Sequence, residues 1–88
     1  MTERIFNEKI YDLIEAWRKD GEYSYISTLH CLLEWHARNM CYPNGDDSIY
    51  FPKKYHSKSD INVVLNSLGI KYSYSTIPCY IQVSLSFD

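Results

Sequence analysis

The chain has 88 residues, of which 45% are hydrophobic and 23% are charged, and its formal net charge is −2. This length fits a single domain, residues 1–88, with a modest core, and the composition excludes both a disordered chain and a strongly basic nucleic-acid binder. The first residues form no apolar leader, and no run approaches the ~18 apolar residues of a membrane helix, so we expect a cytoplasmic protein without a membrane anchor.

An amphipathic helix is predicted from Thr2 to Asp20, with Thr2 as its N-cap and Gly21 ending it. Apolar residues recur at i, i+4, i+7 and i+8, which is the spacing of one buried helix face. They are Phe6, Ile10, Leu13, Ile14 and Trp17.

A second helix is predicted to begin with Ser24 or Ser27 as N-cap and to run to about Cys41. Its apolar face comprises Ile26, Leu29, Leu32, Leu33, Ala37 and Met40. Trp35 falls outside this face. Either the C-terminal sheet covers Trp35, which we favour because large aromatic residues dominate cores, or a partner does.

The segment from Tyr42 to His56 is long for a connection in so small a domain, and such loops often carry binding residues. Within it, Ile49-Tyr50-Phe51 is a candidate short strand ahead of Pro52. A third helix is then predicted from Ser57 to Leu68, because Ser57 and Asp60 have capping-box spacing and Gly69 ends the pattern. Its apolar face comprises Ile61, Val64, Leu65 and Leu68.

Two segments with alternating apolar and polar residues complete the chain and predict an antiparallel hairpin around Thr76-Ile77-Pro78. Ile70, Tyr72 and Tyr74 lie on the apolar face of the first segment. Cys79, Ile81, Val83, Leu85 and Phe87 lie on the apolar face of the second. The predicted fold class is therefore α+β, with three helices, a C-terminal antiparallel β-hairpin and a candidate third strand at residues 49–51.

Residues that suggest chemistry are few. His30, Glu34 and His36 lie close together on the second helix but lack the zinc-protease spacing, so we expect Glu34 to pair with Arg38 and His36 to be a hydrogen-bonded, partly buried imidazole. The adjacent carboxylates at positions 46 and 47 are typical of a solvated turn. The three cysteines are widely spaced, which predicts reduced thiols. We expect no cofactor, no metal and no enzymatic activity, because no nucleophile motif or phosphate loop is present.

A basic cluster precedes the third helix and comprises Lys53, Lys54, His56 and Lys58, with Tyr55 among them. Basic groups near a helix start favour phosphate contact, and an interleaved tyrosine favours base stacking, whereas four solvated side chains require no partner.

The nine tyrosines are the strongest compositional signal. A domain of this size cannot bury nine phenols with every hydroxyl bonded, so several must reach the surface, where tyrosine is enriched in binding sites. Strand propensity accounts for Tyr72, Tyr74 and Tyr80. The candidate partner-binding residues are therefore Tyr42, Tyr50, Tyr55, Trp35, Lys53, Lys54 and Lys58.

Residues 28–87, with the run "SDINVVLNSLGIKYSYS", resemble a winged-helix domain of the kind attached to phage and viral primase-helicases. The resemblance implies that Ser59 to Leu68 is the recognition helix and that Ser75 to Pro78 is the wing tip. This helix has no arginine to read guanine, and the long loop before it departs from a helix-turn-helix.

The sequence thus predicts a non-enzymatic interaction protein, a small phage or mobile-element accessory or inhibitor protein that binds a larger protein partner. The alternative is a winged-helix regulator that binds nucleic acid, working as a homodimer.

Overall fold

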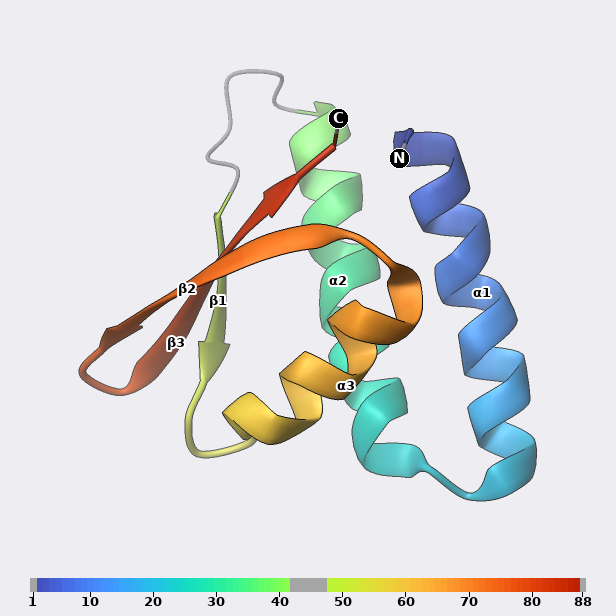
Figure 1. Cartoon of the computed structure of the whole chain (residues 1–88), viewed down its shortest axis with the longest axis horizontal. Helices are drawn as coiled ribbons and strands as arrows, with labels where there is room; N and C mark the ends of the chain where they lie inside the picture. Colours follow the sequence, from blue (N-terminus) through green and yellow to red (C-terminus); the bar gives the residue numbers. More distant parts are fainter. Residues whose placement is uncertain (1, 42–47, 88) are drawn as a thin grey trace.

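The computed structural model describes residues 2–41 and 48–87, which form three helices and a three-stranded antiparallel sheet (Figure 1). The element order is α1 (Glu3–Asp20), α2 (Tyr23–Cys41), β1 (Ser48–Pro52), α3 (Lys58–Leu68), β2 (Lys71–Ile77) and β3 (Tyr80–Ser86). The predicted α+β class and the short third strand are confirmed. The winged-helix likeness is not confirmed, because β1 separates α2 from α3, where a helix-turn-helix has only a short turn.

Helix α1 has the predicted residues at both ends. The Thr2 hydroxyl accepts a hydrogen bond from the Ile5 N–H over 3.2 Å, and Gly21 adopts a left-handed conformation with φ of 76°. Because that glycine reverses the chain, the Glu22 carbonyl already accepts a hydrogen bond from the Ile26 N–H at 3.3 Å. Helix α2 therefore begins at Tyr23, and the prediction that Ser24 or Ser27 caps it is wrong, since both serines lie inside the helix.

The buried face of α2 differs from the predicted one at two positions. Ala37 is exposed, whereas Trp35 is only 8% exposed. The Trp35 ring stacks on Phe87 with 6.3 Å between centroids, and its Nε1 donates a hydrogen bond to the Ser48 carbonyl over 3.0 Å. The sheet therefore covers Trp35, as the favoured interpretation holds. The side chain of Met40 lies outside the described residues.

Helix α3 follows the local prediction closely. The Ser57 hydroxyl accepts a hydrogen bond from the Asp60 N–H over 3.1 Å, and Gly69 ends the helix with φ of 73°. The four residues of its predicted apolar face are all buried: Ile61, Val64, Leu65 and Leu68.

The strand order is β1-β3-β2, so β3 is the central strand. A two-residue turn, Pro78-Cys79, joins β2 to β3, and Ile77 still pairs with Tyr80. The predicted tip at Ser75 to Pro78 therefore begins too early. Cys79 is exposed in the turn with φ of 69°, so its predicted place on the apolar strand face is also wrong.

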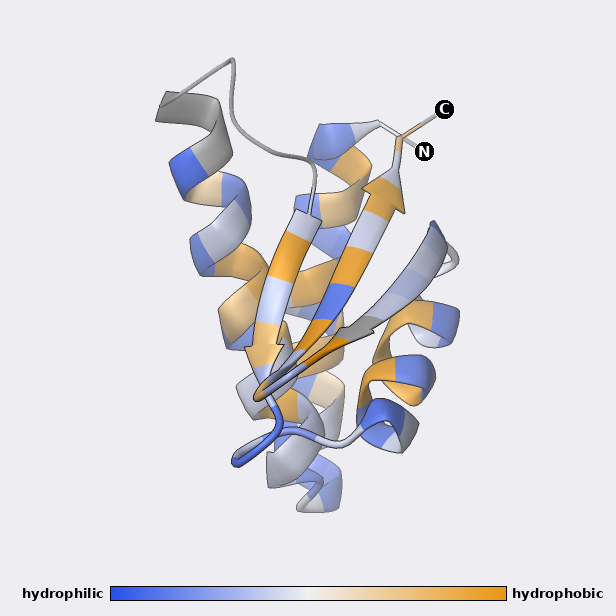
Figure 2. Cartoon of the chain, turned by 90° about the vertical axis from the view of Figure 1, so that its left-hand side faces the viewer, coloured by the Kyte–Doolittle hydropathy of each residue, from blue (hydrophilic) through white to orange (hydrophobic). Residues whose placement is uncertain are grey.

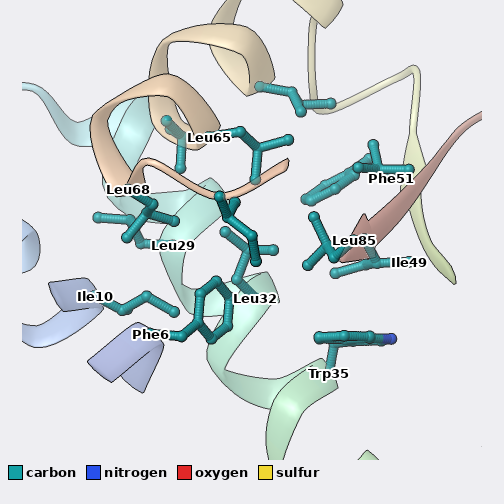
Figure 3. Close-up of a cluster of buried hydrophobic side chains, with 14 of the residues drawn as sticks. Phe6, Ile10, Leu29, Leu32, Trp35, Ile49, Phe51, Leu65, Leu68 and Leu85 are labelled. Carbon is teal, nitrogen blue, oxygen red and sulfur yellow. The ribbon is translucent and has the colours of Figure 1, made fainter. Parts of the chain in front are cut away.

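The molecule has two layers, with the helices against one face of the sheet and the other face open to solvent (Figures 1 and 2). Side chains from all three helices and from the sheet meet in one core (Figure 3). Leu65 and Phe6 are fully buried within it, and Phe51 reaches it from β1. The open face of the sheet carries the alternate, mainly polar residues, and it positions the candidate site.

Candidate interaction surface

The outer face of the sheet carries two of the exposed tyrosines. Tyr50 on β1 is 47% exposed and Tyr80 on β3 is 43% exposed, and their rings meet edge to face with 6.5 Å between centroids. Beside them, the Ser48 hydroxyl lies 3.1 Å from the Ser84 hydroxyl and accepts a hydrogen bond from Gln82 Nε2 over 3.1 Å. These five uncharged residues, which we call the tyrosine face, form a bonded polar surface.

A groove adjoins the tyrosine face at the β1 edge of the sheet. It has a volume of about 420 Å³ and separates β1 from α2. Its lining residues are Cys31, Glu34, Trp35, Arg38, Ser48, Ile49 and Tyr50. The α2–β1 groove thus brings together Tyr50 and Trp35, two predicted candidates that are 15 positions apart in the sequence.

Cys31, which lines the groove, contacts a buried histidine. Cys31 Sγ lies 3.7 Å from His56 Nε2, and His56 Nδ1 lies 3.4 Å from the Thr28 hydroxyl. Burial, reinforced by Glu34, raises the pKa of the Cys31 thiol, and burial lowers the pKa of His56. Both shifts disfavour the thiolate and imidazolium forms of the pair.

His56 therefore does not belong to the basic cluster in which the sequence placed it. Its side chain is buried, and its ring meets that of Phe51 edge to face at 5.2 Å. The sequence could not show this, because the neighbouring lysines are exposed and burial of position 56 depends on the contact between α2 and β1.

The three lysines of the cluster are exposed, and two of them lie over tyrosine rings. Lys54 Nζ is 5.5 Å from the centroid of the Tyr55 ring, and Lys58 Nζ is 4.9 Å from that of Tyr74. Lys53 is held at the hairpin turn by a hydrogen bond from its N–H to the Cys79 carbonyl. Tyr55 is 72% exposed. Tyr42, the remaining candidate, lies outside the described residues.

As far as the structure describes the chain, the polar residues of α2 do not form the predicted Glu34–Arg38 ion pair or the predicted hydrogen bond at His36 Nε2. Glu34 and Arg38 both line the groove, but no ion pair joins them within the described part of the chain. His36 is buried, yet its Nε2 has no hydrogen-bond partner among the described residues, and the nearest carboxylate oxygen, of Glu3, is 3.9 Å away. Within residues 2–41 and 48–87 no three potential ligands lie close enough to hold a metal ion.

The polar face of α3 makes contacts within the domain. The Tyr72 hydroxyl lies 3.1 Å from Asn62 Oδ1 and 3.0 Å from Asn66 Oδ1, and the Tyr74 hydroxyl also bonds Asn62. Asn62 is consequently half-buried. The helix that the winged-helix resemblance implies for base recognition thus has part of its polar face engaged with β2.

Sequence reasoning missed Tyr80 and Arg38 as site residues. Tyr80 was attributed to strand propensity, and only the pairing of β1 with β3 shows that it meets Tyr50. Arg38 was assigned to an ion pair, although its position one helical turn beyond Trp35 already placed it on the same side of α2.

Comparisons with protein-family models, with curated proteins and with solved structures found no match to this chain. No helix in the described ranges is both long and apolar enough to cross a membrane.

Proposed function

We propose that this chain is a non-enzymatic interaction protein that binds a larger protein partner through the tyrosine face and the α2–β1 groove. The observation that carries the proposal is the exposed Tyr50–Tyr80 pair, of which Tyr50 also lines a groove of about 420 Å³. An aromatic pair beside a hollow is the usual form of a binding hot spot, because a partner side chain fills the hollow while the rings exclude water.

The composition of the surface supports a protein partner. Tyrosine supplies a large contact area at low cost in conformational entropy, and serine and glutamine supply adaptable hydrogen bonds. The groove adds one charge of each sign, from Glu34 and Arg38. Such a mixed rim suits a protein surface better than a phosphate backbone, which would be repelled by the carboxylate.

The Cys31–His56 pair supports a non-enzymatic role. It is the arrangement in the described structure closest to a nucleophile and its base, but the pKa shifts of both groups oppose formation of a thiolate. The pair instead acts as a packing and hydrogen-bonding contact between α2 and the segment after β1.

The experiment that tests the proposal captures the partner with the wild-type chain and with single Tyr50→Ala and Tyr80→Ala variants in parallel. A partner that uses this surface should bind each variant about 30-fold more weakly, which corresponds to the ~2 kcal/mol of a hot-spot residue. Tyr23→Ala is the matched control, because Tyr23 is 68% exposed at the start of α2 and outside the proposed surface.

Two results would reject this assignment. One is equal retention of the partner by wild type and both sheet variants, and the other is loss of the partner in Tyr23→Ala alone. Incorporation of a photo-crosslinking residue at position 50 gives an independent readout, since it should form a covalent adduct with the same partner.

A nucleic-acid-binding regulator of the winged-helix kind is the second candidate, and the charge distribution favours it. Residues 48–87 carry four lysines and a single acidic residue, Asp60, which gives this part a formal charge of +3. If these lysines bind phosphates, affinity for DNA should fall steeply with salt, and a Lys53, Lys54 and Lys58 triple alanine variant should lower the salt slope by up to about three charges. Micromolar binding of DNA at physiological salt that is unchanged in Tyr50→Ala would favour this candidate over the first.

A further inference from the structure

The two edges of the sheet differ in how their main-chain groups are used. β1 and β2 are both edge strands, because β3 lies between them. At the β1 edge, the Ser48 carbonyl accepts the hydrogen bond from Trp35, and the Pro52 carbonyl accepts hydrogen bonds from the N–H groups of Tyr55 and His56, each over 3.1 Å. Proline has no N–H of its own to offer. Outward main-chain groups at both ends of β1 are therefore already engaged within the domain.

The direction of each main-chain group on β2 follows from the hairpin turn. A two-residue turn makes its flanking residues, Ile77 and Tyr80, a hydrogen-bonded pair. Because consecutive residues of a strand direct their N–H and C=O groups to opposite sides, the odd-numbered residues of β2 bond β3. Tyr72, Tyr74 and Thr76 then direct their main-chain groups away from the sheet. The hydrogen bond from Lys53 N–H to the Cys79 carbonyl on the other side of β3 fits the same alternation.

The β2 edge carries few of the features that normally protect an edge strand. Its register with β3 runs one residue to one from Lys71 to Ile77, without a bulge, and the strand contains no proline. Among the described residues, no hydrogen bond from another element reaches the main chain of Tyr72 or Tyr74. The outward main-chain groups of Tyr72, Tyr74 and Thr76 thus lie along a strand about 23 Å long at 3.3 Å per residue.

The charges beside this edge indicate what would pair with it. Lys71 begins the strand, and the ammonium of Lys58 lies 4.9 Å from the centroid of the Tyr74 ring. We propose that the β2 edge accepts an extended acidic segment of a partner protein as a fourth strand of the sheet. Main-chain hydrogen bonds would supply affinity, and the Lys58 ammonium beside Tyr74 would select acidic side chains.

A second copy of this chain fits the edge less well. Antiparallel pairing of two β2 strands about Tyr74 would place the two Tyr74 side chains directly opposite each other, with Cβ atoms about 5 Å apart. Each ring carries its own Lys58 ammonium, so the pairing would bring like charges together. An acidic strand replaces this repulsion with attraction.

This surface goes beyond the proposed function, because it is the edge of the sheet on the far side of β3 from β1 and the α2–β1 groove. The test uses two blocked seven-residue peptides, one alternating glutamate with valine and one alternating lysine with valine. Amide hydrogen exchange is measured by NMR with each peptide. The glutamate peptide should slow exchange about tenfold or more at Tyr72, Tyr74 and Thr76, and should leave the Tyr50 amide unchanged. The lysine peptide should have no effect.

Two variants make the test specific. Thr76→Pro removes one outward N–H without removing a bond to β3, so it should weaken binding of the glutamate peptide about tenfold or more, whereas Thr76→Val should not. Lys58→Glu should weaken binding of the glutamate peptide and allow binding of the lysine peptide. Tyr50→Ala should leave the binding of both peptides unchanged, which separates this proposal from the function proposed above.

Several outcomes would overturn the proposal. They are equal protection by both peptides, no protection by either at millimolar concentration, and protection of the Tyr50 amide in place of the β2 amides. Protection of the β2 amides in the free protein that rises with protein concentration would assign the edge to a second copy and would also overturn it.

Discussion

Replacement of Leu65 by alanine tests whether the core lies where the three helices and the sheet meet. Leu65 is fully buried at the centre of α3's apolar face (Figure 3). The substitution removes three carbon atoms, whose transfer from water is worth about 2.4 kcal/mol at 0.8 kcal/mol per methylene. The cavity left behind adds to this, so we expect a loss of about 3 to 4 kcal/mol. A domain of this length has a total stability of only about 4 to 13 kcal/mol, so the loss is a large share.

Urea unfolding followed by circular dichroism measures this loss, and the melting temperature should fall by more than about 12 °C. Val63→Ala is the matched control on the same helix, because Val63 is 38% exposed, and it should cost less than about 1 kcal/mol. Equal losses in the two variants, or a loss below about 1 kcal/mol for Leu65→Ala, would show that this face of α3 does not form the core.

Three further predictions concern the turn, a histidine and a tyrosine. Cys79→Gly should stabilise the protein by about 0.5 to 1 kcal/mol in the same urea assay, because glycine adopts the φ of 69° without the steric cost of a side chain; a loss of stability would contradict this. Burial lowers the pKa of His56 below its usual 6.5, so the unfolded chain binds a proton at this residue more readily than the folded chain does. The stability that neutral His56 contributes is therefore complete above about pH 6.5 and is lost as the pH falls through the folded pKa. Unfolding free energies of wild type and His56→Gln between pH 5 and 8 should therefore converge towards acid, and a constant difference would refute the assignment. Burial, and secondarily the adjacent Tyr72, raises the pKa of Tyr74 to about 12. The ultraviolet titration curve of Tyr74→Phe should therefore lack the last tyrosine ionisation step of the wild type, and loss of an earlier step would contradict this.

The elements that could be predicted from the sequence are those set by local interactions. The ends of α1 and α3 depend on a capping hydroxyl and a left-handed glycine, both of which act within a few residues of the helix. The alternation in β2 and β3 likewise reflects which face each residue occupies. Caps and alternation need no knowledge of the tertiary fold.

The features that were mispredicted depend on contacts between distant segments. Ser24 and Ser27 have the chemistry of N-caps, but the turn at Gly21 starts α2 before either of them. His56 shares a charged neighbourhood in sequence with three lysines, yet Thr28 and Cys31 enclose it in space. The tyrosine face also required the register that places Tyr50 near Tyr80, which no local pattern contains.

The packing of Phe87 has a consequence for how the domain forms during synthesis. Its ring meets Phe6 edge to face at 5.1 Å and stacks on Trp35, so one of the last residues described closes a cluster begun in the first turns of α1. A nascent chain that has not yet emerged as far as residue 87 lacks the ring that packs against both of them. Because the contact between Phe6 and Phe87 spans nearly the whole described sequence, it is formed against a large loss of chain entropy. Until Phe87 is in place, the aromatic end of α1 and α2 keeps exposed apolar surface of the kind that favours association with other chains.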